Sequence, residues 1–310
     1  MVEVDIALGL YNGIPYLNEF LVSLEKQVFA NWRLVVRDDG SNDNSLDIIK
    51  EWALHNKRPL KIIEDSFGNL KVINNFSTCL NHTEAPYVML ADQDDVWFPY
   101  KISDAIAAIK IIESESPIGT PIAVYCDLQV VDAELNVIFP SMLRMQQQDM
   151  RRLPSLPQLL SQNVAPGCSM IVNRALLTAA LPIPKAAVMH DWWLMLIAQT
   201  FGKIGHIQRP GIAYRQHESN QVGAKQGNLL SIAKEVFHAG LTPYLLRLEQ
   251  SLQQANALAE LVPANHPYKP IIKLYAELKS FPPLLRQIRA CRAGISKVGP
   301  LRNFIFYCLM

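Results

Sequence analysis

The chain has 310 residues, of which half are hydrophobic and 18% are charged, and its formal net charge is +1. This composition excludes a disordered or collagen-like chain, because there are enough apolar side chains to build a sizeable core. A net charge near zero also gives no support for a general nucleic-acid binder.

The charge is unevenly distributed along the chain. Residues 1–224 hold 18 basic and 24 acidic residues, a net charge of −6, whereas residues 225–310 hold 11 basic and 4 acidic residues, a net charge of +7. No acidic residue follows Glu277. We therefore expect two regions with different surroundings, a catalytic domain over 1–224 and a basic region over 225–310.

The cysteines and the first residues indicate the cellular compartment in which the protein is expected. The five cysteines are scattered without a Cys-x-x-Cys pair, which favours reduced thiols over a zinc knuckle or a disulfide framework. No positively charged segment precedes the first apolar run, and no stretch of about 18 uncharged apolar residues occurs. We expect no signal peptide, no transmembrane helix and a cytoplasmic protein.

The first 115 residues alternate between strand and helix patterns. Short apolar runs predict strands over 4–10, 32–37, 60–64 and 87–91, and helical spacing of apolar residues predicts helices over 15–27, 45–54, 72–80 and 101–113. Such alternation is typical of βαβ units and therefore of an α/β fold with a mostly parallel central sheet.

The pattern is less regular after residue 120. We expect a strand pair within 120–138, formed by 123–126 and 128–131 on either side of Asp127, and a loop or short helix over 140–163. A return to the fold over 164–174, a helix over 191–201 and a last strand over 204–214 follow. From about residue 226 onward the pattern is helical, with one apolar face formed by Leu229, Ile232, Ala233 and Val236.

A cluster of acids follows the buried strand at 87–91. Asp92, Asp94 and Asp95 lie within four residues of one another, and like charges so close together need a compensating cation or polar network. A hard divalent cation, Mg²⁺ or Mn²⁺, prefers such oxygen ligands and would also bridge a diphosphate. The alternative is a solvated acidic turn that caps the next helix.

Two further polar turns follow strands, and in parallel sheets ligands bind at these carboxyl ends. Asp38-Asp39-Gly40-Ser41 is a common turn type, although a carboxylate there could also accept a hydrogen bond from a pyrimidine base. At Leu10-Tyr11-Asn12-Gly13, the backbone and the next helix N-terminus could approach a nucleotide. Neither GxGxxG nor GxxxxGK[ST] is present.

Taken in order, these segments resemble family-2 glycosyltransferases of the GT-A fold. The resemblance rests on Ala-Leu-Gly-Leu-Tyr-Asn-Gly, Asp-Asp-Gly-Ser-Asn-Asp and Ala-Asp-Gln-Asp-Asp-Val-Trp, and it extends through about residue 223. Pro166-Gly167-Cys168 resembles the acceptor-side glycine loop, and the segment 189–193 resembles the one that supplies the catalytic base. The segment 214–220 resembles the late histidine segment, and the combination is most similar to bacterial rhamnosyltransferase-like members.

The resemblance implies roles in donor binding. Asp39 would hold the base, with Asp38 as a weaker candidate, and Tyr11 and Asn12 would line the base and ribose site. Asp92 would face the ribose or the donor sugar.

It also implies a metal and diphosphate site. Asp94 would ligate Mg²⁺ or Mn²⁺, and His217 would contact the metal or the diphosphate. Arg215 and Lys71 would add positive charge, although Lys71 is equally consistent with a surface lysine because the family's asparagine-glycine pattern is imperfect at 68–71. Asp95 would lie behind the metal ligands or on the acceptor side.

Asp191 would be the catalytic base. Because it stands at a predicted helix start, its alternative role is an N-cap. Trp192 and Trp193 suit packing or a sugar platform, and packing is the favoured interpretation for Trp193.

These roles predict an inverting transferase that moves one sugar from a nucleotide-diphosphate sugar to a saccharide or lipid-linked acceptor. The Gln-x-x-Arg-Trp segment of processive members is absent, which favours a single addition. The resemblance favours a dTDP-rhamnose donor and bacterial surface polysaccharide synthesis. The alternatives are a sugar nucleotidyltransferase and a non-catalytic sugar-nucleotide binding protein.

The last 85 residues lie outside the motifs. There the basic residues Arg286, Arg289, Arg292, Lys297 and Arg302 interleave with apolar residues, a pattern typical of a membrane-surface helix. These apolar residues are Leu284, Leu285, Ile288, Ile295, Phe304, Ile305, Phe306 and Tyr307. It would suit lipid-linked acceptors at the inner leaflet. The alternative is a helix face that packs on the domain or on a second copy in a homodimer.

Overall fold

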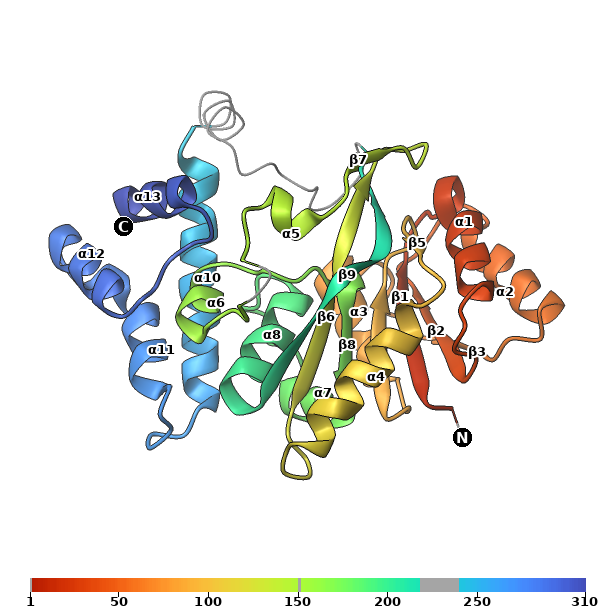
Figure 1. Ribbon diagram of the computed structural model, residues 1–310, viewed down its shortest axis with the longest axis horizontal. Coiled ribbons are helices and arrows are strands. Elements are labelled where there is room, and N and C mark those ends of the chain that lie inside the picture. Colours follow the sequence, from red (N-terminus) through yellow and green to blue (C-terminus); the bar gives the residue numbers. More distant parts are fainter. Residues whose placement is uncertain (1, 150–151, 218–239) are drawn as a thin grey trace.

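A computed structural model describes residues 2–149, 152–217 and 240–310. The chain crosses the molecule from one end to the other: the first strands and helices lie at the right of Figure 1, and the last helices lie at the left. The predicted strands of the first half are all present, as are its helices.

Four parallel strands form one side of the central sheet. They stand in the order β3-β2-β1-β4, with bounds β1 (Val4–Leu10), β2 (Trp32–Asp38), β3 (Leu60–Ile62) and β4 (Tyr87–Ala91). They are connected by α1 (Ile14–Glu25), α2 (Ser45–His55) and α3 (Lys71–Asn81). Because helices cover both faces, β1 and β4 are apolar and almost wholly buried.

The other side of the sheet mixes strand directions. Its strands are β5 (Val96–Trp97), β6 (Ile122–Val131), β7 (Val137–Phe139), β8 (Met170–Asn173) and β9 (Lys203–Arg215). β8 runs antiparallel between β4 and β6, and β9 runs parallel to β6. β5 and β7 are short antiparallel additions. The predicted α/β fold with its mostly parallel sheet is confirmed.

The predicted strand pair around Asp127 was wrong, because β6 runs unbroken through that residue. Its register with β9 shifts on both sides of Asp127. The buried carboxylate accepts hydrogen bonds from the Leu128 amide (2.8 Å), from the Leu143 amide (3.2 Å) and from the Ser141 hydroxyl. A local bulge therefore accommodates Asp127 within the strand, although a charged residue at this position suggests a turn in the sequence.

The remaining helices of the first 217 residues surround this side of the sheet. They are α4 (Lys101–Ser114), α5 (Met142–Met145), α6 (Leu156–Ser161), the 3₁₀ turn η1 (Gly167–Ser169), α7 (Arg174–Ala180) and α8 (His190–Phe201). The segment 140–163, expected to be a loop or short helix, thus contains two short helices.

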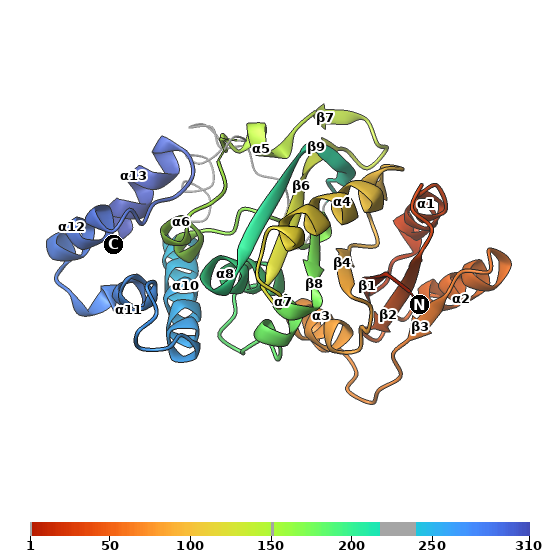
Figure 2. The same cartoon turned by 60° about the horizontal axis from the view of Figure 1, so that its bottom comes forward.

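The C-terminal region is helical, as expected, and is not separate from the rest. It comprises α10 (Thr242–Leu261), α11 (Lys269–Ala276), the 3₁₀ turn η2 (Leu278–Ser280), α12 (Pro283–Arg292) and α13 (Pro300–Leu309). One hydrophobic core cluster contains Trp193 and Leu196 of α8 together with Leu252 and Leu258 of α10. α10 lies beside α6 and α8 in both views (Figures 1 and 2).

Two sequence expectations fall outside the described residues. These are the boundary at 224/225 and the apolar face formed by Leu229, Ile232, Ala233 and Val236. Within the described ranges, no helix is long and apolar enough to cross a membrane.

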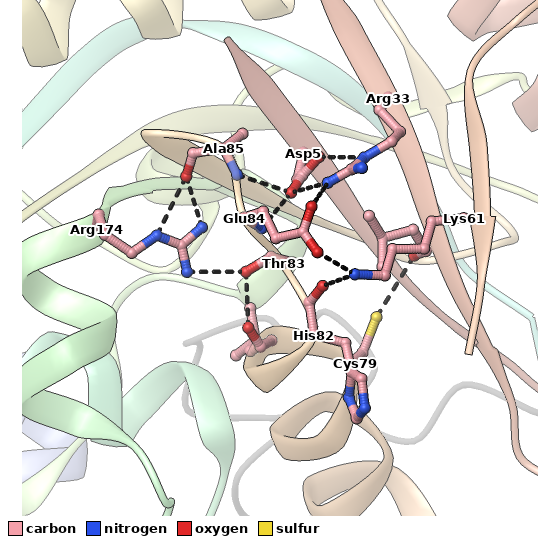
Figure 3. A network of polar contacts seen from close by, with 11 residues as sticks. Asp5, Arg33, Lys61, Cys79, His82, Thr83, Glu84, Ala85 and Arg174 are labelled. Atoms are coloured by element: carbon pink, nitrogen blue, oxygen red, sulfur yellow. Dashed lines mark hydrogen bonds and ion pairs between the residues drawn. The ribbon is translucent and has the colours of Figure 1, made fainter. Parts of the chain in front are cut away.

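A network of hydrogen bonds and ion pairs joins neighbouring strands near their amino ends (Figure 3). The fully buried Asp5 accepts two hydrogen bonds from Arg33, at 2.9 and 3.0 Å, and two more from the amides of Glu84 and Ala85. Glu84 in turn pairs with Lys61 at 2.6 Å. Asp5 therefore joins β1 to β2 and to the turn before β4.

Candidate active site

The turn after β1 is held by side chains from two other turns. Gln93 accepts a hydrogen bond from the Tyr11 amide (2.9 Å) and donates one to the Tyr11 carbonyl (2.7 Å), which leaves the Tyr11 ring about half exposed. Asn12 has a positive φ of 48°, and its side-chain oxygen accepts from the Asn42 amide (2.9 Å). The first two polar turns and the acidic turn thus meet at one edge of the sheet.

The start of α1 is already bonded within the protein. The Gly13 amide donates to the Ser45 hydroxyl (2.7 Å), and the Ile14 amide donates to the Asp43 carboxylate (3.3 Å). These two amides anchor the segment 41–45, and the approach of this turn to a nucleotide stays a prediction.

Asp39 is buried at the end of β2. Its carboxylate accepts from the Arg37 guanidinium (2.7 Å) and from the amides of Leu70 (2.6 Å) and Lys71 (2.9 Å). Arg37 also pairs with Asp65 at 2.7 Å. Asp39 therefore fastens the segment before α3 to the sheet, and both of its oxygens have partners in the protein.

The neighbours of Asp39 take different roles. Asp38 accepts from both the amide (3.0 Å) and the hydroxyl (2.6 Å) of Ser41, which shapes the turn. Lys71 is exposed at the first position of α3 with a positive φ of 64°. Its backbone amide reaches Asp39 at the same edge of the sheet.

The acidic turn brings Asp94 to the end of β9. Its Oδ2 lies 2.8 Å from Nε2 of His217, whose ring stacks on Tyr16 with ring centroids 4.7 Å apart. These two residues are 123 positions apart in the chain, and the sequence analysis predicted both as metal-site residues. The rest of the predicted late segment, 218–220, lies outside the described residues.

Arg215 is buried and bonded to protein atoms. Its Nε donates to the Asp94 carbonyl (2.9 Å), its Nη1 donates to the Ala133 carbonyl, and its Nη2 pairs with Glu19. The expectation that it reaches the diphosphate finds no support in these contacts. They orient the acidic turn instead.

Two residues of the same turn, the partly buried Asp92 and the buried Asp95, form a second group with the buried Cys168. Ligand atoms of Asp92, Asp95 and Cys168 all lie within 4.8 Å of one another. Burial, followed by the charge of Asp94, raises the pKa of Asp92 to about 7. Burial and the charges of Asp94 and Asp92 hold the pKa of Asp95 well above its usual range, and Asp95 Oδ2 has no hydrogen-bond partner.

Lys101 is a buried cation whose charge acts on Asp92 and Cys168 of this group. Burial lowers the pKa of its amine to about 8, while Asp95 and Asp92 act to raise it. Its Nζ lies 3.1 Å from the centroid of the Trp97 ring and has no hydrogen-bond partner. Neither the burial of Lys101 nor the position of Cys168 beside the acids was predicted from the sequence. A lysine at the start of a helix gives no signal that it is buried.

These residues fit a divalent cation. A buried carboxylate oxygen without a partner and several carboxyl groups in one place are the features that a bound cation would compensate. Asp94 and His217 already face each other at the surface of the group. Burial holds the pKa of the Cys168 thiol well above its usual range, so a neutral thiol is a poor ligand for Mg²⁺ or Mn²⁺.

Asp191 lies in the first turn of α8 and is 7% exposed. Its Oδ2 accepts from the Gly167 amide (2.9 Å), and its Oδ1 accepts from the Trp192 amide (2.6 Å). Burial raises the pKa of its carboxyl to about 6. The N-cap residue is Met189, so the alternative role for Asp191 as N-cap is wrong.

The predicted glycine loop lies directly against Asp191. A Cβ added to Gly167 would lie 2.9 Å from Nε2 of His190, whose ring stacks on Phe76. A side chain at position 167 would therefore require the His190 ring to move. The charge of Asp191 also contributes to the raised pKa of Asp92, so the predicted base lies close to the acidic turn.

The two tryptophans after Asp191 pack in the interior. Trp192 Nε1 donates to the Leu159 carbonyl (2.6 Å), and Trp193 Nε1 donates to the Ala180 carbonyl (3.0 Å). Both rings are buried, which agrees with the packing interpretation favoured for Trp193.

The segment before Asp191 is also held from the C-terminal region. Gln254 of α10 is fully buried, and its Oε1 accepts from the Val188 amide at 2.8 Å. This contact was missed because it joins residues 66 positions apart, and no periodic pattern encodes it.

Comparison with known proteins then decides the family. The model for glycosyl transferase family 2 matches residues 5–171. The chain belongs to this family. It is a glycosyltransferase, and its membership supports the predicted nucleotide-sugar donor over the nucleotidyltransferase and non-catalytic alternatives.

Two curated relatives illustrate the likeness. The dTDP-rhamnosyl transferase RfbG of Shigella flexneri is 26% identical over 266 residues, covering 82% of this chain and 85% of that protein. EpsE of Bacillus subtilis is 29% identical over 133 residues, covering 43% of this chain and 48% of its own length.

Solved structures share the fold. TarS 1–349 of S. aureus, determined in complex with UDP-GlcNAc, has a TM-score of 0.54 at 17% identity and covers 99% of this chain and 90% of its own. The mannosyltransferase PcManGT of Pyrobaculum calidifontis, in complex with GDP-Man and Mn²⁺, has a TM-score of 0.55 at 18% identity, covering 94% and 73%. At these identities the likeness concerns the fold.

Proposed function

We propose that this glycosyltransferase is inverting and metal-dependent and adds one sugar from a nucleotide-diphosphate sugar to an acceptor hydroxyl. The observation that carries the proposal is Asp191. A carboxylate held by the Gly167 amide, with its pKa raised to about 6, is suited to accept a proton near neutral pH. It also lies beside the acidic turn where the donor diphosphate would bind.

The chemistry follows from these positions. Asp191 accepts the proton of the acceptor hydroxyl while that oxygen attacks the anomeric carbon and the bond to the nucleotide diphosphate breaks. A single displacement with one base inverts the anomeric centre, and its transition state is oxocarbenium-like. His217, beside Asp94, would contact the metal or the leaving diphosphate.

Mg²⁺ or Mn²⁺ would be held by Asp94, with His217 and the neighbouring Asp92, and when bound it neutralises charge on the leaving diphosphate. The fold relative PcManGT was solved with Mn²⁺ bound alongside GDP-Man, which supports divalent metal use. Arg215 keeps the Asp94 backbone in place through its hydrogen bond to the carbonyl.

The nucleotide would lie along the first two turns. Tyr11 offers an exposed ring for the base, Asn12 lines the ribose side, and Lys71 extends from α3 near the diphosphate. Asp39 already accepts three hydrogen bonds within the protein, so we assign it chiefly to shaping this pocket, although its Oδ2 has a single partner among the described residues and could accept one more bond from the base.

The donor and acceptor are proposed from the relatives. RfbG supports a dTDP-rhamnose donor. WfgD of Escherichia coli, 26% identical over 113 residues, is named for a diphosphoundecaprenol-linked acceptor, which supports a lipid-linked acceptor in bacterial surface polysaccharide synthesis. Such an acceptor would bring the enzyme to the inner membrane face. A thermal-shift screen of sugar nucleotides with Mg²⁺ or Mn²⁺ identifies the donor.

The decisive experiment replaces the base. Asp191→Asn keeps the shape and an oxygen for the Gly167 amide but cannot accept the proton. We expect transfer to fall by at least about a thousandfold while the affinity for the nucleotide diphosphate, measured by calorimetry, stays within twofold. Asp47→Asn, an exposed acid of α2, is the matched control. Full transfer activity in Asp191→Asn would remove Asp191 from this role.

A further inference from the structure

Helix α12 turns an apolar face away from the rest of the molecule. Leu284, Leu285 and Ile288 are 71%, 40% and 39% exposed. On the opposite side, Ala290 is fully buried and Gln287 donates to the Tyr307 carbonyl of α13 at 2.9 Å. Surface helices normally show the reverse arrangement, with apolar residues toward the core. The exposed side therefore calls for a partner.

The basic residues of this region divide into exposed arginines and one that is bonded within the protein. Arg289 and Arg292 are exposed and flank the apolar side chains, with Arg289 lying over the Phe281 ring at 3.9 Å. Arg286 points inward, where it donates to the carbonyls of Phe281 (3.0 Å) and Met310. Of the arginines expected on a membrane-surface helix, Arg289 and Arg292 can therefore contact a partner, whereas Arg286 cannot.

Two apolar side chains that were expected on the membrane surface are also buried in the protein. Ile295 and Phe306 belong to the hydrophobic core and cannot reach a partner. We define the α12 face by five of the exposed residues on this helix: Leu284, Leu285, Ile288, Arg289 and Arg292.

We propose that the α12 face binds the surface of an anionic phospholipid bilayer. The proposal rests on the proposed function, because a lipid-linked acceptor is presented at such a surface. The leucines and Ile288 would enter the boundary between headgroups and acyl chains, and the arginines would be attracted by anionic headgroups.

Charge favours a bilayer over a second copy of the chain. Residues 278–310 contain six lysines and arginines and no acid. In a symmetric dimer through this face, each copy would bring Arg289 and Arg292 against the same residues of its partner, with no acid of the segment to compensate. Like-charge juxtaposition opposes such a dimer, whereas an anionic surface complements the face.

Vesicle flotation of the full-length protein tests the proposal. We expect flotation with vesicles containing phosphatidylglycerol and phosphatidylcholine, and little with phosphatidylcholine alone. Arg289→Gln/Arg292→Gln should lower the partition coefficient about thirtyfold, and Leu284→Ser/Ile288→Ser at least about tenfold. Matched controls are Leu54→Ser, an exposed leucine of α2, and Lys26→Gln/Lys185→Gln, which should float as the parent does.

Three results would overturn the proposal: equal flotation with both vesicle types, unchanged flotation of both α12 variants, or a parent dimer that the α12 variants convert to monomer in sedimentation velocity. Folding is checked by thermal unfolding, since these side chains are exposed. Hydrolysis of the sugar nucleotide without vesicles should be equal in the parent and the α12 variants. If the parent hydrolyses no sugar nucleotide, the result counts against the proposed function and not against membrane binding by the α12 face.

Discussion

At the scale of single residues, the site depends on how two carboxyl groups are held. Asp39 and Asp191 are both buried and both accept hydrogen bonds from backbone amides. Asp39 also has the Arg37 guanidinium at 2.7 Å, whereas Asp191 accepts hydrogen bonds from the neutral amides of Gly167 and Trp192. The first is therefore suited to structure and the second to proton transfer.

This difference predicts a pH dependence. The base is active when deprotonated, so a pKa of about 6 means that kcat should rise with pH, with a midpoint near 6, and level off above about 7. A bound divalent cation nearby would move the midpoint down, because it favours the carboxylate. The measurement is kcat from about pH 4.5 to 8.5 at saturating substrates, restricted to pH values where the protein stays folded. A midpoint above about 7, or a rate that falls with rising pH, would contradict it.

At the scale of elements, the first half of the chain could be predicted from local pattern and the second only in part. β1 to β4 are short apolar runs closed by turn residues, so their strands and the polar edge they share follow from the sequence. β6 was misjudged because a strand with a charged centre is stable only through partners such as Ser141, fourteen positions away. The positions of Lys101, Cys168 and Gln254 depend on similarly distant contacts.

α10 should therefore act on catalysis through Gln254. Gln254→Leu removes the acceptor of the partly buried Val188 amide, three residues before Asp191. We expect the free energy of unfolding to fall by about 1–3 kcal/mol. We also expect kcat to fall several-fold while the donor KM changes little, because the donor turns lie on other elements. Calorimetric or denaturant unfolding and steady-state kinetics provide the two readouts.

Gln253→Leu on the same helix is the matched control, because Gln253 is exposed. It should change neither quantity. A donor KM that rises as much as kcat falls in Gln254→Leu would show a general loss of structure rather than an effect on the base.

At the scale of the whole molecule, the charge division along the chain corresponds to two surfaces. The acidic turn lies on the sheet, and the basic segment 278–310 lies at the far end of the molecule (Figure 1). The two ends share one hydrophobic core through α8 and α10. The near-zero net charge thus conceals a polarised molecule.

The stability of the whole fold should depend on the network around Asp5. Burial opposes ionisation of Asp5, but hydrogen bonds from Arg33 and from two amides hold its pKa below 3.8. A group with a lowered folded-state pKa stabilises the fold above its unfolded pKa, and this stability is lost as the pH falls below about 4. Asp5→Asn should lower the free energy of unfolding at about pH 7 by about 3 kcal/mol.

Denaturant unfolding at about pH 7 and at about pH 3 tests this. The difference between parent and Asp5→Asn should shrink at the lower pH, where the parent carboxyl also becomes protonated. Asp132→Asn serves as a control, because the Asp132 pKa is also lowered but the residue is only partly buried and its hydrogen bonds stay within the turn after β6. A difference that grows toward the lower pH would contradict the assignment.

The hydrogen bond between Gln254 and Val188 also has a consequence for biosynthesis. On the ribosome, every turn that would hold the donor is made before residue 218, yet the residue that steadies the base segment, Gln254, emerges well after it. A nascent or prematurely terminated chain would therefore complete its donor turns before its base segment is held. A nascent chain that binds the sugar nucleotide at that stage would transfer the sugar efficiently only after Gln254 has been synthesised and bonded to Val188.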